Sequence, residues 1–314
     1  MKIELPHTTV SKIQKSLVQI REEGGAVALG RVLTLVVATS LGHEEEAIEA
    51  ANEASREHPM RVIIVSRDQG DTTSPGRLDA QIRVGSDAGA SEVIVLRACG
   101  ETATDEEGLV TGLLLPDAPV VAWWPELAPK TPAESPLGRI AQRRITDAAN
   151  QSDPTAAVAA LAASYRPGDT DFAWTRLTLW RNQLAAALDQ PPYEPVTGVE
   201  VSGASDSPST ILLAAWLQLQ LQVPVTTVTS PRGTGSSGIH GVTLVRASGP
   251  IVLDRSLVDV ATLSQPGQPV HDLSLPRRSL RDCLAEELRR LDPDVLFGDV
   301  VKHGVCQLSD AVAG

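Results

Sequence analysis

The chain has 314 residues, of which 42% are hydrophobic and 21% charged, a balance typical of globular proteins and sufficient for about two domains. Its formal charge of −12 would be repelled by a nucleic-acid backbone or an anionic lipid surface, so we expect neither nucleic acid nor a membrane as a partner. The chain begins without an apolar signal-peptide core, and no apolar stretch approaches the roughly 20 residues of a membrane span, so we expect a cytoplasmic protein.

The first half of the chain alternates helical and extended patterns. Apolar residues recur at helical spacing from Val10 to Ile20, and a βαβ pattern follows. The predicted elements after the first helix are a strand at 32–38, a helix at 43–58, strands at 62–65, 80–84 and 93–96, and a helix at 105–114. On the second helix, Glu49, Glu53 and Glu57 share one face, which we interpret as solvated, with docking to a basic partner as the alternative.

The apolar run Leu113–Pro125, with the sequence LLLPDAPVVAWWP, predicts a buried strand between Pro119 and Pro125. Neighbouring residues of a strand point to opposite faces of its sheet, so Trp123 and Trp124 must pack against different layers. We expect this strand either to join the domains or to mark a docking surface, and we favour the first.

The second half of the chain repeats this order of elements after a connection rich in proline and alanine. A long predicted helix begins at Asp171 and ends before Pro191. The later predicted elements are strands at 199–202, 223–229, 242–245 and 251–254 and helices at 208–221, 280–291 and 294–302. This order predicts two similar α/β domains with mixed sheets, produced by internal duplication. The predicted domains are residues 1–167 and 168–304, followed by a tail at 305–314.

No motif in the chain indicates catalysis. The GxGxxG match at Gly233–Gly238 precedes a predicted strand, whereas a dinucleotide site requires a helix there, so we interpret it as a connecting loop. The six histidines are scattered, and no P-loop, nucleophile elbow or HExxH sequence occurs. We therefore predict no catalytic residue, no metal site and no cofactor.

One predicted helix start could hold an anion. The run Ser205–Thr210 follows a strand and opens a helix, so backbone N–H groups gather there at the positive end of the helix dipole. The residues of this predicted phosphate site are Ser205, Ser207, Ser209 and Thr210, with Arg232 as the nearest counter-charge. The competing interpretation is a simple helix cap, and Asp206 argues against phosphate.

The aromatic inventory points to partner binding, because five of the nine aromatic residues are tryptophans. Trp180 and Trp216 lie within apolar patterns and are predicted to belong to the core. Aromatic and arginine anchors carry most of the binding energy of protein interfaces. The residues that we predict to bind a partner are Trp123, Trp124, Trp174, Arg176 and Arg181, with packing between the domains as the alternative.

The three cysteines, Cys99, Cys283 and Cys306, are widely spaced and form no CxxC or Cys/His pattern. We predict that they are small buried residues, and a redox switch between Cys283 and Cys306 is the alternative.

Four segments together resemble the glucose-6-phosphate dehydrogenase assembly protein family, OpcA, and especially its actinobacterial members. They are LPDAPVVAWWP at Leu115–Pro125, DFAWTRLTLWRNQLAAALD at Asp171–Asp189, SGASDSPSTILLAAWL at Ser202–Leu217, and the helical end at Asp292–His303. The resemblance covers nearly the whole chain. It implies a noncatalytic partner that binds glucose-6-phosphate dehydrogenase of the pentose phosphate pathway and promotes its assembly or allosteric activation. The alternative, from the residues alone, is a sugar-phosphate- or nucleotide-binding enzyme or sensor that uses the Ser205–Thr210 helix start.

Overall fold

The computed structural model describes residues 1–23, 31–68, 70, 72–85, 92–230, 238–255 and 257–308. They form two compact units. Unit 1 contains Met1–Asp147, Gly168–Thr170 and Ser279–Pro293, and unit 2 contains Ala148–Pro167, Asp171–Arg278 and the chain from Asp294 onward. The units therefore interleave along the chain, whereas the sequence suggested one boundary between residues 167 and 168. The predicted α/β class with mixed sheets is confirmed.

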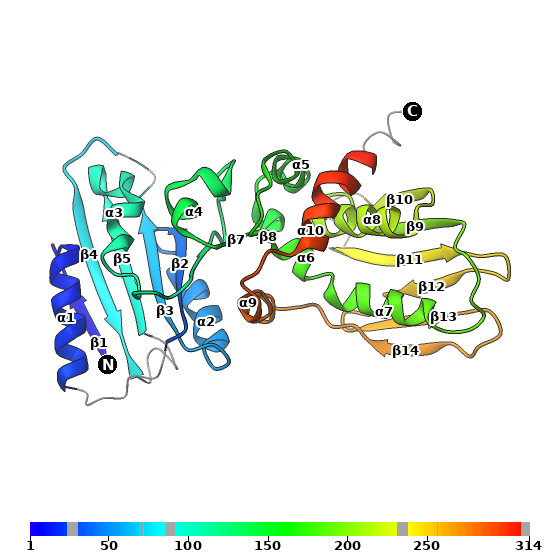
Figure 1. The fold of residues 1–314 in the computed structure, drawn as a ribbon, viewed down its shortest axis with the longest axis horizontal. Helices are drawn as coiled ribbons and strands as arrows, with labels where there is room; N and C mark the ends of the chain where they lie inside the picture. The colour runs from blue at the N-terminus through cyan, green and yellow to red at the C-terminus, as the bar shows by residue number, and fades with distance from the viewer. Residues whose placement is uncertain are drawn as a thin grey trace. The chain divides into compact units, whose positions relative to one another are not determined.

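Unit 1 is built on an eight-stranded sheet in the order β1-β4-β5-β3-β2-β6-β7-β8 (Figure 1). The strands are β1 (Lys2–Leu5), β2 (Leu33–Ser40), β3 (Met60–Arg67), β4 (Arg77–Arg83), β5 (Glu92–Cys99), β6 (Val120–Trp123), β7 (Arg143–Thr146) and β8 (Asp169–Asp171). The neighbours from β5 through β3, β2 and β6 to β7 are parallel, and β4 runs antiparallel to both β5 and β1. The continuous Val, Ile and Leu runs of β2 and β3 are typical of parallel strands buried on both faces.

Helices cover both faces of this sheet. The helices α1 (Val10–Glu23), α3 (Glu106–Thr111) and α4 (Pro136–Ile140) share one apolar cluster with the sheet. On the other side, α2 (Glu44–Ala54) contacts β2, β3 and α9 (Leu280–Arg289). Arg281 of α9 forms an ion pair with Glu53 of α2, and Arg289 forms one with Glu57, just after α2. Two of the three glutamates that the sequence suggested to share a solvated face, Glu53 and Glu57, thus pair with arginines of the same unit while their side chains stay 39% and 50% exposed.

The tryptophan strand, β6, lies inside this sheet between β2 and β7. Trp123 pairs in register with Val37 and Ile145 and is fully buried. Trp124 is also buried, but it belongs to the apolar cluster on the α1, α3 and α4 side, which does not include Trp123. The prediction that the two rings pack against different layers is confirmed.

Unit 2 contains a six-stranded sheet in the order β10-β9-β11-β12-β13-β14. The strands are β9 (Gly198–Ala204), β10 (Val225–Ser230), β11 (Ile239–Val245), β12 (Ile251–Asp254), β13 (Val260–Ser264) and β14 (His271–Ser274). Only β9 and β10 are parallel among these described neighbours. Because unit 1 has a mainly parallel sheet and unit 2 a mainly antiparallel one, the predicted internal duplication is not confirmed.

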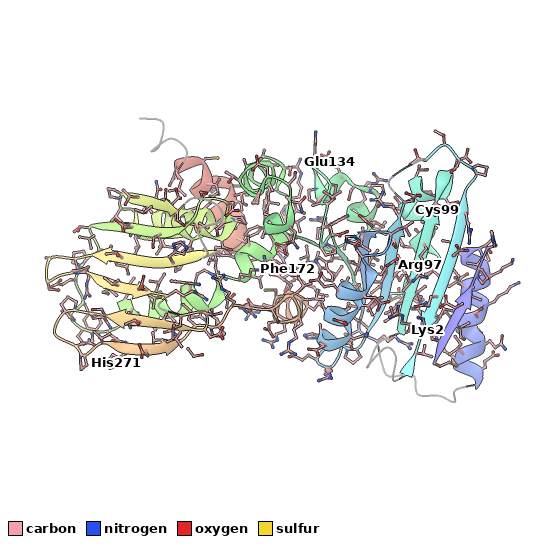
Figure 2. All side chains as sticks on the ribbon, turned by 180° about the vertical axis from the view of Figure 1, so that it is seen from behind. Lys2, Arg97, Cys99, Glu134, Phe172 and His271 are labelled. Atoms are coloured by element: carbon pink, nitrogen blue, oxygen red, sulfur yellow. The ribbon has the colours of Figure 1, made fainter. Side chains whose placement is uncertain are left out.

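One apolar cluster joins the sheet of unit 2 to its helices. These are α5 (Pro154–Ser164), α6 (Phe172–Thr175), α7 (Thr178–Leu188), α8 (Pro208–Leu221), α10 (Val295–Asp299) and the π-helical turn Val300–Gly304. Phe172, labelled in Figure 2, begins α6 and is fully buried. The sequence predicted a single long helix here, but the chain divides it into α6 and α7. In the described parts of the chain, no helix has both the length and the apolarity to span a bilayer.

Candidate functional site

The parallel sheet of unit 1 reverses its strand order at β2, because β3 and β5 lie on one side of it and β6 and β7 on the other. Ligands of α/β proteins usually bind at the carboxyl ends of the strands at such a point. Here Glu126, just after β6, lies at that place. Its carboxylate accepts hydrogen bonds from the Ser40 N–H at 3.1 Å and the Thr39 hydroxyl at 3.0 Å, and it contacts His43 Nδ1. The protein's own carboxylate thus takes the donors that an anionic ligand would use.

The charge of Glu126 is stabilised by this arrangement. Burial by itself raises the pKa of the carboxyl, but the hydrogen bonds from Ser40 and Thr39 and the neighbouring His43 outweigh burial, so the net pKa is lowered. Glu126 therefore remains ionised at neutral pH. A fixed negative charge at the carboxyl ends of β2 and β6 disfavours phosphate binding.

A cavity of about 470 Å³ lies near the same edge of unit 1, lined in part by Trp124, Leu127, Arg67 and Glu106. Arg67 Nε lies 3.0 Å from the Glu106 carboxylate. Burial raises the pKa of Glu106, and the positive charge of Arg67 only partly offsets this effect. The cavity thus contains a paired acid and base beside an aromatic wall.

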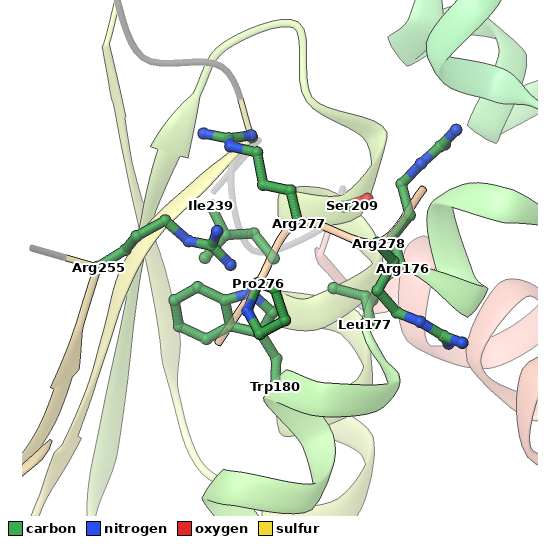
Figure 3. Close-up of a pocket in the computed structure, with 10 residues that line it drawn as sticks. Arg176, Leu177, Trp180, Ser209, Ile239, Arg255, Pro276, Arg277 and Arg278 are labelled. Atoms are coloured by element: carbon green, nitrogen blue, oxygen red, sulfur yellow. The ribbon is translucent and has the colours of Figure 1, made fainter. Parts of the chain in front are cut away.

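A second cavity, of about 190 Å³, lies in unit 2 and is rich in arginine (Figure 3). Its lining combines Trp180 of α7 and Ser209 of α8 with arginines from separate parts of the chain. These arginines are Arg176, Arg255, Arg277 and Arg278. None of the described lining residues is acidic, although the whole chain carries a formal charge of −12.

Arg255 is the arginine of this cavity that lies against Trp180. Figure 3 shows its side chain reaching over the indole ring of Trp180, and the guanidinium carbon lies 5.3 Å from the ring centroid. Nη1 donates to the carbonyl of Val258 at 2.8 Å, whereas Nε is buried and has no hydrogen-bond partner in the described chain. Burial lowers the pKa of Arg255, and the nearby positive charge of Arg277 lowers it further, while Asp259 acts in the opposite direction.

The side chains of the predicted phosphate site have different environments and different hydrogen-bond partners in the structure. Ser207 caps α8 by accepting a hydrogen bond from the Thr210 N–H at 3.2 Å, which matches the competing cap interpretation. Ser209 lines the arginine-rich cavity and donates its hydroxyl to the Ala173 carbonyl at 2.8 Å. Thr210 is buried and Ser205 is exposed. Arg232 lies outside the described residues.

The residues predicted to bind a partner are also separated. Trp123 and Trp124 are buried in unit 1, and Trp174 is buried in unit 2. Trp174 Nε1 donates to Asp294 at 2.8 Å, and the Arg181 guanidinium lies 3.8 Å from its ring centroid. Arg176 instead lines the arginine-rich cavity. The three rings therefore contribute to the interiors of their units.

Sequence reasoning missed Arg255 and the Arg277–Arg278 pair of the arginine-rich cavity, and it also missed one exposed aromatic residue, Tyr193. Arg255 follows a short strand and carries no local motif, and the adjacent Arg277 and Arg278 were visible only as a basic pair after Pro276. Tyr193 follows Pro191–Pro192 and is 79% exposed. An exposed aromatic ring after two prolines was the available signal for a surface residue.

The three cysteines form no disulfide with one another. Cys283 is buried in unit 1, but Cys306 is exposed in unit 2, so the prediction that all three are buried is wrong for Cys306. Cys99, labelled in Figure 2, ends β5 and is half-buried. The burial of Cys283 does not favour an exchange reaction at that thiol.

Comparison with known proteins gives two family matches, one in each half of the chain. Residues 51–163 match the family model described as the glucose-6-phosphate dehydrogenase subunit N-terminal domain, and residues 167–301 match the corresponding C-terminal domain. No curated protein matches the chain. A crystal structure of glucose-6-phosphate 1-dehydrogenase from Mycobacterium avium aligns over 90% of this chain and 92% of that chain, with 11% identity and a TM-score of 0.42. That similarity is too low to support a functional argument.

The two family matches show that the chain belongs to the OpcA family of glucose-6-phosphate dehydrogenase subunits.

Proposed function

We propose that this protein is a noncatalytic partner that binds glucose-6-phosphate dehydrogenase and promotes its assembly or activation. The observation that carries the proposal is the pair of consecutive family matches, which together extend from residue 51 to residue 301 and name both domains as dehydrogenase subunit domains. The role requires no chemistry of its own, in agreement with the lack of a catalytic motif in the sequence.

The carboxyl edge of the unit 1 sheet supports a noncatalytic role. The Ser40 N–H and the Thr39 hydroxyl are held by Glu126. Glu44, at the start of α2, accepts a hydrogen bond from Ser66 at 2.7 Å and lies 3.3 Å from Arg97, which is labelled in Figure 2. These polar groups already have partners within the protein. A substrate would have to displace these internal partners in order to use the same groups.

A partner protein can activate the dehydrogenase only by binding its active state more tightly than its inactive state. The size of the activation is limited by that difference in affinity. Where the active state also binds substrate more tightly, substrate and this protein affect each other's binding to the dehydrogenase by the same factor. The proposal therefore predicts a physical complex together with a change in the substrate affinity or rate of the dehydrogenase.

Unit 2 offers exposed groups suited to a protein interface. Tyr193 is a largely exposed aromatic residue, and tyrosine is enriched among the residues that dominate interface energies. The edge strand β10 has the sequence VTTVTS, and its four central residues are exposed. It lacks the charges and prolines that usually protect an edge strand from pairing with another chain. We propose that the dehydrogenase contacts one or both of these features.

The test is to mix the purified protein with glucose-6-phosphate dehydrogenase from the same source and to analyse the mixture by gel filtration and kinetics. We expect co-elution and a change in the substrate affinity or rate of the dehydrogenase. Separate elution over a wide range of concentrations, together with unchanged kinetics, would contradict the proposal.

A further inference from the structure

We propose that the arginine-rich cavity of unit 2 binds the phosphate group of a small phosphorylated metabolite between Arg255 and Arg277. This inference goes beyond the proposed docking to the dehydrogenase, because it assigns a small-molecule site to the protein itself. It also differs from the site that the sequence suggested at Ser205–Thr210, of which Ser209 alone lines this cavity among the described residues.

The first argument is the balance of charge. The cavity collects arginines from three connecting segments of an otherwise acidic protein, and its described lining has no carboxylate. Arg255 and Arg277 are close enough for the charge of one to disfavour that of the other, and Arg255 is also partly desolvated. A bound dianion would relieve both the repulsion and the loss of hydration. Such a cluster is therefore better suited to an anion than to an apolar ligand.

The second argument is an unused hydrogen-bond donor. Arg255 is held in place by its Nη1 bond to Val258 and by the face of Trp180. Its Nε–H is buried without a hydrogen-bond partner in the described chain, an arrangement that is costly unless a partner is supplied. Guanidinium groups present their N–H donors in a planar fork that matches the oxygens of a phosphate. The unused donor and the fixed guanidinium plane therefore suit a phosphate group, which offers several oxygens, better than a ligand with a single acceptor atom.

The third argument concerns position and size. Ser209 lies in the first turn of the 14-residue helix α8, so the positive end of that helix dipole adds to the charge of the arginines. The cavity volume of about 190 Å³ is below the roughly 300–1,000 Å³ typical of sites for drug-sized ligands. A phosphate group with a small organic part is therefore better suited to the cavity than a dinucleotide.

Isothermal titration of the full-length protein with inorganic phosphate and with glucose 6-phosphate tests this inference, with glucose and acetate as controls. We expect both phosphate compounds to bind, and glucose and acetate to bind at least about tenfold more weakly, because a phosphate dianion can use the paired guanidinium groups. Absence of binding by both phosphate compounds at millimolar concentrations would overturn the inference. Equal binding of acetate would overturn the assignment to phosphate.

Two substitutions link the binding to the cavity. Arg277→Gln changes an exposed residue and should leave folding intact, and Arg255→Gln removes the cation that lies against Trp180. Each should weaken phosphate binding by about tenfold or more, the effect of losing one charge-assisted hydrogen bond. Arg166→Gln removes an exposed arginine elsewhere in unit 2 and should change the affinity less than about twofold. Wild-type affinity in the folded Arg277→Gln protein would overturn the inference.

Discussion

The backbone N–H of Ser40 donates a hydrogen bond to the carboxylate of Glu126 at 3.1 Å, at the point where the parallel sheet of unit 1 reverses its strand order. In α/β enzymes this position commonly receives a ligand. In this protein it receives a side chain that lies three residues after Trp123. The fold of unit 1 therefore resembles a ligand-binding architecture in its topology, while the donors at its strand-order reversal are occupied by Glu126.

Glu126→Gln should lower the free energy of unfolding at neutral pH. Because the pKa of Glu126 is lowered in the folded state, its ionised carboxylate stabilises that state at pH values above the ordinary pKa of 4.5. This contribution is lost as the pH falls through the folded-state pKa. The difference between the variant and the wild type should therefore shrink on acidification. Urea unfolding at several pH values measures it, and a difference that is constant or grows toward acid would contradict the account.

Glu106→Gln should show the opposite pH dependence and serves as the matched comparison in the same unit. Burial raises the pKa of Glu106 in the folded state, so ionising this carboxyl destabilises the folded state. The loss of stability develops as the pH rises from the ordinary pKa of 4.5 through the folded-state pKa. The variant should be more stable relative to wild type at neutral pH than at acid pH. The same urea series checks this, and an equal difference at both extremes would show that Arg67 fully compensates burial.

Breaking the ion pair between Arg143 and Glu287 should destabilise unit 1 strongly. Both side chains are 5% exposed, and Arg143 also donates to the carbonyl of Asp292 at 2.7 Å. Glu287→Ala leaves the arginine charge buried without its partner, at a cost of about 3–5 kcal/mol. Glu57→Ala, which breaks the exposed pair with Arg289, should cost about 1 kcal/mol or less. Chemical denaturation that gave similar losses for both variants would contradict this assignment.

Trp123→Ala and Trp124→Ala should each reduce the free energy of unfolding by about 3–5 kcal/mol, because both rings are buried in unit 1. The sequence instead placed both rings among the residues predicted to bind a partner. Thermal and urea unfolding of the two variants decide between these expectations. A variant with wild-type stability and weakened dehydrogenase binding would restore the docking interpretation for that ring.

Tyr193→Ala should leave the stability nearly unchanged and weaken binding to the dehydrogenase. An exposed aromatic residue has little packing to lose, and removal of an interface anchor typically costs about 2 kcal/mol or more of binding free energy. Val270→Ala, at another exposed apolar position of unit 2, is the control. Surface plasmon resonance compares the variants, and equal affinities for Tyr193→Ala and wild type would place the interface elsewhere.

Strong periodicity made much of the fold predictable. The helix at 208–221 was placed at its observed bounds because Ser207 caps it, Pro208 opens it and an apolar run follows. The strands of the βαβ unit were recognised because buried parallel strands are uniformly apolar. Short strands such as β7, β8 and β14 were missed because three or four residues, most of them polar, carry no reliable period.

The order of elements did not determine their pairing, which is why the duplication was inferred from sequence but not confirmed. Strand direction depends on contacts distant in the chain, such as Val242 with both Val201 and Leu253. The same limitation applies to the sites. Arg255 and Trp180 lie 75 positions apart in the sequence, so no local spacing could bring them together. The capping role of Ser207, in contrast, is local and was among the sequence-based interpretations.

The most direct test of the central claim is a titration of glucose-6-phosphate dehydrogenase with this protein, in which activity and complex formation are measured in the same samples. The account predicts a saturable change in activity whose midpoint matches the dissociation constant of the complex, and a reciprocal effect of substrate on that constant. Unchanged activity, with no complex at any concentration tested, would contradict it.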